Sequence, residues 1–165
     1  MDTLHFRNAT LADLPGIVAI YNSTVASRMV TADTEPVSVA SRIPWFEVHT
    51  ADKWPLWVVE CNQEMVGWVS LQAFYGRPAY AATAEVSIYL AEEARSQGFG
   101  KRILQHCIDK AYQFSINTLL GFIFAHNEPS LQLFKKAGFQ EWGFLPNIAV
   151  LDGIERSVVI LGKRI

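Results

Sequence analysis

Cysteine is scarce in this chain, with only Cys61 and Cys107 among 165 residues. The two are far apart in sequence, form no Cys-x-x-Cys pair and have no metal-ligand spacing around them. This excludes a disulfide framework and a zinc finger as the basis of the fold. We therefore expect two reduced, mostly buried thiols and no metal site.

Long apolar runs and an excess of one charge are also missing. No apolar run approaches the ~20 residues of a membrane helix, and the start, "MDTLHFRNATLADLPGI", is too polar for a signal peptide. A net charge of -2 provides no general attraction to nucleic acid or to an anionic membrane. The expectation is a cytoplasmic protein that acts on a small molecule, with no nucleic-acid or membrane partner.

Hydrophobic material, by contrast, is plentiful. Half of the residues are hydrophobic, which is enough for one core, and no linker, repeat or low-complexity tract divides the chain. The patterns predict a strand, two helices, antiparallel strands, a helix, a strand, a helix and a final hairpin. One mixed α/β domain over residues 1–165 follows from that order.

Individual elements are predicted by their periodicity and end signals. We expect helices over residues 11–25, 38–49, 99–114 and from near residue 129 to residue 138. Pro44 should shorten or kink the second of these helices. Asp152-Gly153 between two β-rich runs predicts a tight hairpin. The segment "AEVSIYL" alternates strictly, so Glu85, Ser87 and Tyr89 should share one face of a strand.

The stretch "EEARSQGFGKRIL" places Gly98 and Gly100 between that strand and a helix. Glycines let a ligand approach bare backbone, and the start of a helix offers unpaired N–H groups and the positive end of its dipole. Together they could hold a phosphate, with Lys101 and Arg102 nearby. The alternative is a plain loop and helix cap, since Gly-x-Gly pairs are common. The spacing fits neither a Walker loop nor a dinucleotide fingerprint.

Arg95-x-x-Gly98-x-Gly100 resembles the acetyl-CoA loop of the GNAT superfamily of N-acetyltransferases. The segment "NEPSLQLFKKAGF" resembles the family's Asn…Ser…Gly-Phe element, in the family's order and spacing. "IYNSTV", "WF", "AYAATAEVSIYL" and "LQLFKKAGF" further resemble the phosphinothricin and methionine sulfoximine acetyltransferase branch. The resemblance implies a mostly antiparallel twisted sheet with a splayed central strand pair and helices on both faces. It also implies acetyl-CoA as cosubstrate, no metal, and the homodimer that many relatives form.

The resemblance also implies which residues hold the coenzyme. Backbone N–H groups from Gln97 to Lys101 should bind the pyrophosphate, and the backbone of residues 88–90 should pair with the pantetheine arm. Asn127 should contact the pantetheine amides, or simply cap the next helix. The full set of predicted coenzyme-binding residues is Ile88, Tyr89, Leu90, Arg95, Gln97, Gly98, Phe99, Gly100, Lys101, Asn127, Ser130 and Phe134.

The implied reaction moves an acetyl group to a primary amine by direct attack in a ternary complex. Glu85 is the candidate base, acting through a water with a pKa raised by partial burial, although it could instead be a rim carboxylate. Many relatives have a tyrosine where this chain has Phe134, which cannot protonate the leaving thiolate. Tyr89 and His126 are the candidate substitutes.

The acceptor is expected to be a small amino acid or analogue such as phosphinothricin or methionine sulfoximine. Arg77 could clamp its carboxylate, with Tyr80 and Glu85 as further acceptor-binding residues. Tyr75, Trp45 and Phe46 could wall the pocket, although ordinary core packing is the competing interpretation. Two other functions stay open: a non-catalytic acyl-CoA-binding regulatory module, which Phe134 favours, and acetylation of a polyamine or a protein N-terminus.

Overall fold

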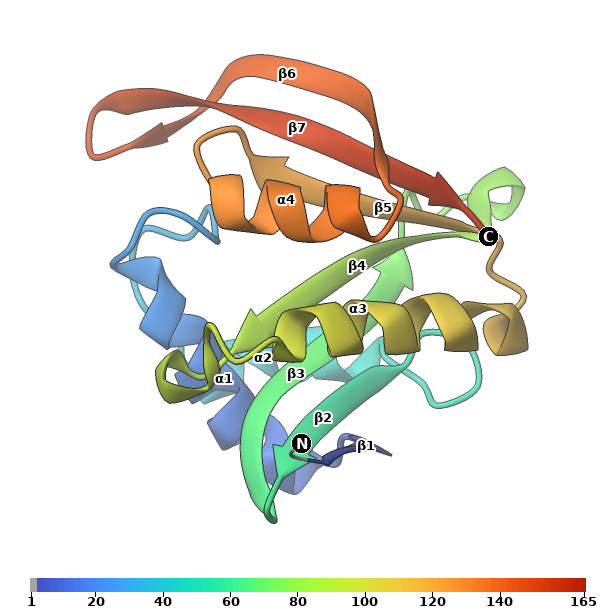
Figure 1. Ribbon diagram of the computed structural model, residues 1–165. Coiled ribbons are helices and arrows are strands. Elements are labelled where there is room, and N and C mark those ends of the chain that lie inside the picture. The colour runs from blue at the N-terminus through green and yellow to red at the C-terminus, as the bar shows by residue number, and fades with distance from the viewer. Residues whose placement is uncertain (1–2) are drawn as a thin grey trace.

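One seven-stranded sheet organises the computed structural model, which describes residues 3–165 (Figure 1). The strands lie in the order β1-β2-β3-β4-β5-β7-β6, and every neighbouring pair is antiparallel except β4 and β5. Their bounds are β1 Leu4–Asn8, β2 Leu56–Cys61, β3 Glu64–Ala73, β4 Thr83–Leu90, β5 Thr118–Phe124, β6 Gln140–Leu151 and β7 Ile154–Arg164. The predicted mixed, mostly antiparallel sheet is confirmed.

Helices cover both faces of the sheet, as predicted (Figure 1). α1 and α2 lie behind the sheet in that view, and α3 and α4 lie in front of it. The bounds are α1 Leu14–Val25, α2 Val39–Glu47, α3 Phe99–Lys110 and α4 Glu128–Lys136. Short 3₁₀ turns occur at Leu11–Asp13, Pro78–Tyr80, Glu92–Ala94 and Ala111–Phe114. A continuous core of buried aliphatic and aromatic side chains fills both layers.

Local hydrogen bonds explain where the helices begin and end. Asp13 accepts the backbone N–H of Thr10 at 2.7 Å, which closes a capping box and leaves a 3₁₀ turn before α1. Ser38 caps α2 by accepting the Ser41 N–H at 3.1 Å, and α2 ends at Glu47 with Pro44 inside it. The predicted helix over residues 99–114 is an α-helix followed by a 3₁₀ turn.

β4 and β5 separate soon after they meet. Their parallel pairing covers only the three steps from Thr83–Thr118 to Glu85–Leu120, whereas β4 stays paired with β3 as far as Leu90. Beyond Glu85, the edge of β4 that faces β5 is left without a strand partner. The predicted splayed strand pair is therefore confirmed, and it opens a slot that a ligand could fill as an added strand.

The C-terminal hairpin has the predicted turn. Asp152 and Gly153 both adopt positive φ angles, 52° and 78°, as the favoured two-residue turn requires. β6 forms the edge of the sheet and its register shifts between Leu145 and Ala149, around a proline. Several large apolar side chains of β6 are exposed: Trp142, Phe144, Ile148 and Val150.

Both cysteines are found where the sequence predicted them. Cys61 and Cys107 are free and buried, and burial raises the pKa of the Cys107 thiol. Within residues 3–165, no helix combines the length and hydropathy that a membrane crossing needs. The same residues contain no group of three or more His, Cys, Asp or Glu side chains placed to hold a metal ion.

Candidate active site

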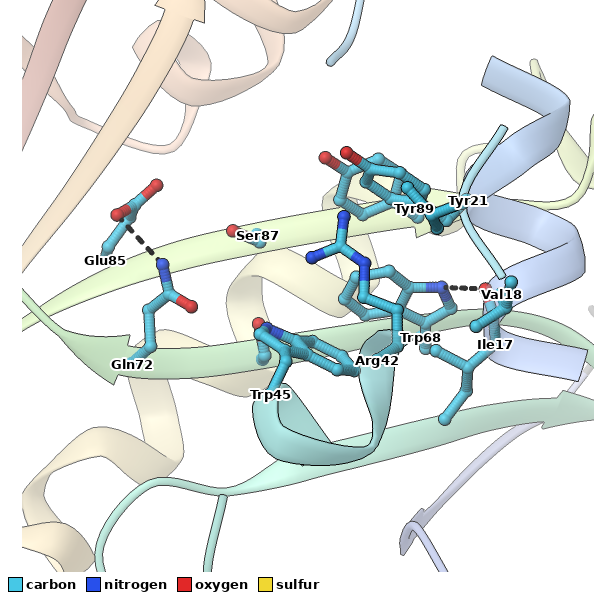
Figure 2. Close-up of a pocket in the computed structure, with 12 residues that line it drawn as sticks. Ile17, Val18, Tyr21, Arg42, Trp45, Trp68, Gln72, Glu85, Ser87 and Tyr89 are labelled. Atoms are coloured by element: carbon cyan, nitrogen blue, oxygen red, sulfur yellow. Dashed lines mark hydrogen bonds between the residues drawn. The ribbon is translucent and has the colours of Figure 1, made fainter. Parts of the chain in front are cut away.

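A pocket of about 250 Å³ lies between α1, α2 and the face of β3 and β4 opposite α3 (Figure 2). Its position follows from the strand alternation, which turns Glu85, Ser87 and Tyr89 of β4 to this face. The residues that line it are Ile17, Val18, Tyr21, Val37, Arg42, Trp45, Trp68, Ser70, Gln72, Glu85, Ser87 and Tyr89. Glu85 lines the pocket and is also the last residue of β4 that pairs with β5, so the pocket lies beside the start of the predicted coenzyme slot.

Two opposite pairs of polar residues form the floor. The antiparallel register sets Gln72 opposite Glu85 and Ser70 opposite Ser87. Gln72 Nε2 donates a hydrogen bond to Glu85 Oε2 at 3.1 Å. Burial raises the pKa of the Glu85 carboxyl, and the bond from Gln72 opposes that rise. Glu85 is thus a partly buried carboxylate inside the pocket, with an amide rather than an arginine as its recorded partner.

Aromatic rings form one wall. Tyr89 stacks on Trp68 with centroids 4.5 Å apart, and Tyr21 lies 5.1 Å from Tyr89. Trp45 from α2 packs edge-on against Trp68 at 5.4 Å. Burial raises the pKa of the Tyr89 hydroxyl, so Tyr89 keeps its proton at neutral pH. The wall is apolar over most of its surface and presents hydroxyl groups at one end.

Arg42 brings a positive charge into the pocket from α2 (Figure 2). Its Nη2 donates to Asp33 Oδ2 at 3.0 Å, and its guanidinium carbon lies 4.7 Å from the Tyr21 ring centroid. The Tyr21 hydroxyl donates to the same Asp33 carboxylate and contacts the Thr31 hydroxyl. Among the lining residues, Arg42 is the one cation and Glu85 the one anion.

The glycine loop lies at the N-terminus of α3, after the end of β4. Gly98 is the N-cap with φ 78°, and no side chain caps the helix. A Cβ on Gly98 would meet nothing within 4 Å, whereas one on Gly100 would lie 3.2 Å from Leu133 Cδ2. The first glycine therefore exposes bare backbone to open space, and the second lets α3 pack closely on α4. Uncapped N–H groups beside an open cradle fit the pyrophosphate that the sequence predicted.

Three predicted coenzyme residues of this loop make contacts within the protein. Arg95 donates to the Leu90 carbonyl at 3.2 and 3.3 Å and to Ser23 Oγ at 3.3 Å. Gln97 Nε2 donates to the Glu93 carbonyl at 2.6 Å, and Phe99 is buried in the core. Arg95 thus fastens the end of β4 to α1. Lys101 is exposed on the first turn of α3.

The predicted coenzyme residues at α4 also make contacts within the protein. The buried Asn127 side chain accepts the Ser130 N–H at 3.3 Å, which makes Asn127 the helix cap. The Phe134 ring lies on Gly121 of β5, since a Cβ there would be 2.7 Å from Phe134 Cε1. Phe134 also packs edge-on against Phe139 at 4.9 Å. Phe134 is therefore a packing residue here, and its contact with the coenzyme stays a prediction.

Arg77 and Tyr80 are not among the residues that line the pocket. They lie at a 3₁₀ turn before β4, where the rings of Phe74, Tyr75 and Tyr80 pack on one another. Their acceptor-binding role stays a prediction. His126 hydrogen-bonds through Nε2 to the Arg28 carbonyl at 2.7 Å, and it too does not line the pocket.

Of the two predicted wall residues of α2, Trp45 lines the pocket and Phe46 does not. Arg42, Tyr21 and the polar floor residues of β3 were not predicted from the sequence. One signal could have found Arg42, because it precedes Trp45 by three residues and so shares a helix face with it.

Comparison with known proteins agrees with this geometry. Residues 3–140 match the model of the acetyltransferase (GNAT) domain family. The chain is 51% identical over 160 residues to "Putative phosphinothricin acetyltransferase YwnH" of Bacillus subtilis (strain 168), covering 96% of this chain and 98% of that one. It is 30% identical over 143 residues to "L-methionine sulfoximine/L-methionine sulfone acetyltransferase" of Pseudomonas paraeruginosa, covering 86% and 83% of the two chains.

A solved structure shows the same fold with the donor bound. The phosphinothricin acetyltransferase (Pat) of Sinorhizobium meliloti, in complex with AcCoA, superposes with a TM-score of 0.92 at 26% identity, over 99% of this chain and 89% of that one. The resemblance inferred from the two glycine-containing motifs is thus confirmed. The chain belongs to the GNAT family of acetyltransferases, in the branch that contains the phosphinothricin and methionine sulfoximine acetyltransferases.

Proposed function

We propose that this N-acetyltransferase moves the acetyl group of acetyl-CoA to the α-amine of a small amino acid or amino-acid analogue, by direct attack in a ternary complex. Methionine sulfoximine, methionine sulfone and phosphinothricin are the proposed acceptors. The observation that carries the proposal is the small pocket beside the β4–β5 slot, which holds one carboxylate and aromatic walls. Relatives named for these same acceptors support it.

Acetyl-CoA supplies the acetyl group as a thioester whose thiolate leaves. The N–H groups at the start of α3 would hold its phosphates, where the Gly98 backbone is bare. The unpaired edge of β4 from Ile88 to Leu90 would hydrogen-bond the pantetheine arm as an added strand. An N–H in that stretch would stabilise the charge that develops on the carbonyl oxygen.

Glu85 would accept a proton from the acceptor ammonium, through a water, so that the neutral amine attacks. The new bond joins the amine nitrogen to the acetyl carbon while the carbon–sulfur bond breaks. The nitrogen then loses its second proton to water, so the products are the N-acetyl amide and the thiolate of coenzyme A. A free thiol has a pKa of ~8.5, so the thiolate can leave without a general acid. Tyr89 keeps its proton at neutral pH and is the one predicted donor that lines the pocket.

Two further properties belong to the proposal. The exposed apolar side chains of β6, including Trp142 and Phe144, suit contact with a second copy, so we propose a homodimer. A cytoplasmic location agrees with two free buried thiols.

The alternative acceptors differ in what they need from the site. A polyamine carries several positive charges and would need an acidic groove, whereas this pocket contains one carboxylate and one guanidinium. The family assignment favours an enzyme over a non-catalytic acyl-CoA-binding module.

The test incubates purified protein with acetyl-CoA and each acceptor in turn, and follows thiol release and the N-acetyl product by mass spectrometry. Release with methionine sulfoximine or phosphinothricin supports the proposal. Tight acetyl-CoA binding with no release from any amine would refute it.

A further inference from the structure

Arg42 carries a positive charge in the pocket, and the proposed catalytic steps assign no role to it. Its guanidinium reaches from α2 toward the strand that carries Ser87, while Glu85 lies farther along that strand (Figure 2). The side chain is 26% exposed, so most of its length is already withdrawn from water. Such a position is costly for a cation unless charged or polar groups complete its surroundings.

The resident partner of Arg42 satisfies only part of the guanidinium. Among residues 3–165, Asp33 is its one recorded hydrogen-bond acceptor, through Nη2 alone. Asp33 is itself 43% exposed and also accepts the Tyr21 hydroxyl. A guanidinium has five N–H donors in a planar fork that matches two oxygens of an oxyanion. Donors therefore remain on Arg42 for a ligand in the pocket.

A second polar group of the pocket also lacks a partner. Ser70 is fully buried, and its Oγ makes no hydrogen bond to any residue that the structure describes. It lines the same pocket, opposite Ser87 in the β3–β4 register. A buried hydroxyl without a partner is unfavourable, and a polar ligand would relieve that cost.

We propose that Arg42 binds two oxygen atoms of one group of the acceptor, with Ser70 as a further donor from the floor. This inference rests on the proposed function, since it assigns the group that recognises the acceptor in the same pocket. These oxygens are either those of the anionic α-carboxylate or those at the far end of the side chain, which belong to an anionic phosphinate in phosphinothricin and to a neutral sulfone in methionine sulfone. Arg42 is then a specificity-determining residue, because its charge rejects polyamines and favours acidic or zwitterionic acceptors.

The experiment measures KM and kcat for the wild type, Arg42→Gln, Arg42→Lys and Arg77→Gln. Three acceptors with the same α-amine are compared: L-methionine sulfone, its α-carboxamide, and L-methionine. Arg7→Gln is the matched control, because Arg7 is also paired with carboxylates but lies on β1, outside the pocket. Acetyl-CoA affinity is titrated for every variant and should not change, which shows that each variant is folded.

Arg42→Gln should raise KM about 10- to 100-fold, the effect of losing a hydrogen bond to a charged group. The KM of Arg42→Lys should lie between those of the wild type and Arg42→Gln, because lysine keeps the positive charge but lacks the planar pair of N–H donors. If Arg42 binds the carboxylate, KM rises for the sulfone and for methionine but not for the carboxamide. If it binds the far oxygens, KM rises for the sulfone and its carboxamide but not for methionine.

A change in KM below about threefold for all three acceptors would overturn the inference, and a rise caused by Arg77→Gln alone would assign the role to Arg77. The proposed function fails separately, if the wild type releases no thiol with any of these acceptors. Calorimetric titration of methionine sulfone then decides the inference. Weaker binding to Arg42→Gln than to the wild type keeps it, and equal or absent binding removes it.

Discussion

The side-chain amide of Gln72 donates a hydrogen bond to the Glu85 carboxylate at 3.1 Å, across the β3–β4 register (Figure 2). Burial raises the pKa of Glu85, and this bond lowers it. Gln72 takes no part in the proposed reaction, but its hydrogen bond offsets part of the rise in the pKa of Glu85 that burial causes. The pH dependence of the reaction should therefore change when either Glu85 or Gln72 is substituted.

Glu85→Gln should lower kcat by about 100-fold, the usual effect of losing a general base. In the wild type, kcat/KM should fall as pH decreases through the raised pKa of Glu85, because only the carboxylate accepts a proton. Glu85→Gln should lose this acidic limb but keep the limb of the acceptor amine itself. Gln72→Leu removes the bond that lowers the pKa, so its acidic limb should move to higher pH.

Gln132→Leu is the matched control for Gln72→Leu. Gln132 also donates to a glutamate, Glu128 at 2.7 Å, but on the exposed face of α4. Its pH profile should match the wild type. If the acidic limb of kcat/KM for Gln72→Leu stays at the wild-type pH or moves to lower pH, the proposed role of Glu85 is wrong.

Gly98→Glu should abolish acetyl-CoA binding, because the side chain would enter the open cradle at the start of α3. Gly153 is the comparison position, since it has the same φ of 78° and the same open surroundings, at the β6–β7 turn. Alanine at either glycine should cost about 1–2 kcal/mol of folding stability, from the left-handed backbone. In calorimetry, acetyl-CoA binding should be weakened by the substitutions of Gly98 and unchanged by Gly153→Ala. If Gly98→Glu, Gly98→Ala and Gly153→Ala all bind acetyl-CoA with the same affinity, the loop assignment is wrong.

Gly121→Ala should destabilise the protein by about 1–3 kcal/mol, because its Cβ would overlap the Phe134 ring. In a Phe134→Leu background the same substitution should cost much less, since the smaller side chain can yield. Urea denaturation of the two single variants and the double variant measures this coupling. Additive costs would show that Phe134 does not pack on Gly121 in solution.

Phe144→Glu should convert the proposed homodimer into a monomer, because it places a charge within the exposed apolar side chains of β6. Phe144 is 51% exposed, and Leu11, which is 57% exposed on the turn before α1, provides the control substitution Leu11→Glu. Light scattering after size-exclusion chromatography gives the mass of each. A monomeric wild type, or a dimer that survives Phe144→Glu, would contradict this interface.

Local signals predicted most of the fold. The Asp152-Gly153 turn, the capping of α4 and the alternation of β4 are written in a few neighbouring residues, and each appears where it was predicted. The start of α1 was wrong by three residues, because the Thr10–Asp13 capping box favours a 3₁₀ turn first. The splay of β4 came from the family resemblance, since no local pattern encodes where two strands part.

The site was predicted less completely. Glu85 could be found because its strand leads into the glycine loop. Arg42, Tyr21 and Gln72 belong to three other elements, and only tertiary packing brings them together around one pocket. For Arg95 the family motif predicted a coenzyme-binding residue, but the side chain donates to the Leu90 carbonyl within the protein. A motif gives the position of a residue in the chain and does not give its hydrogen-bond partners.

We propose above all that the pocket beside the β4–β5 slot accepts a small amino acid. The most direct measurement is a competition in one vessel, with acetyl-CoA limiting and methionine sulfoximine, phosphinothricin, spermidine and a short peptide at equal concentration. Mass spectrometry then identifies the N-acetyl products. We expect acetyl-methionine sulfoximine or acetyl-phosphinothricin to be the main product, and we expect Glu85→Gln to suppress its formation. If spermidine or the peptide is instead the main acetylated product, the pocket is not a site for small amino acids.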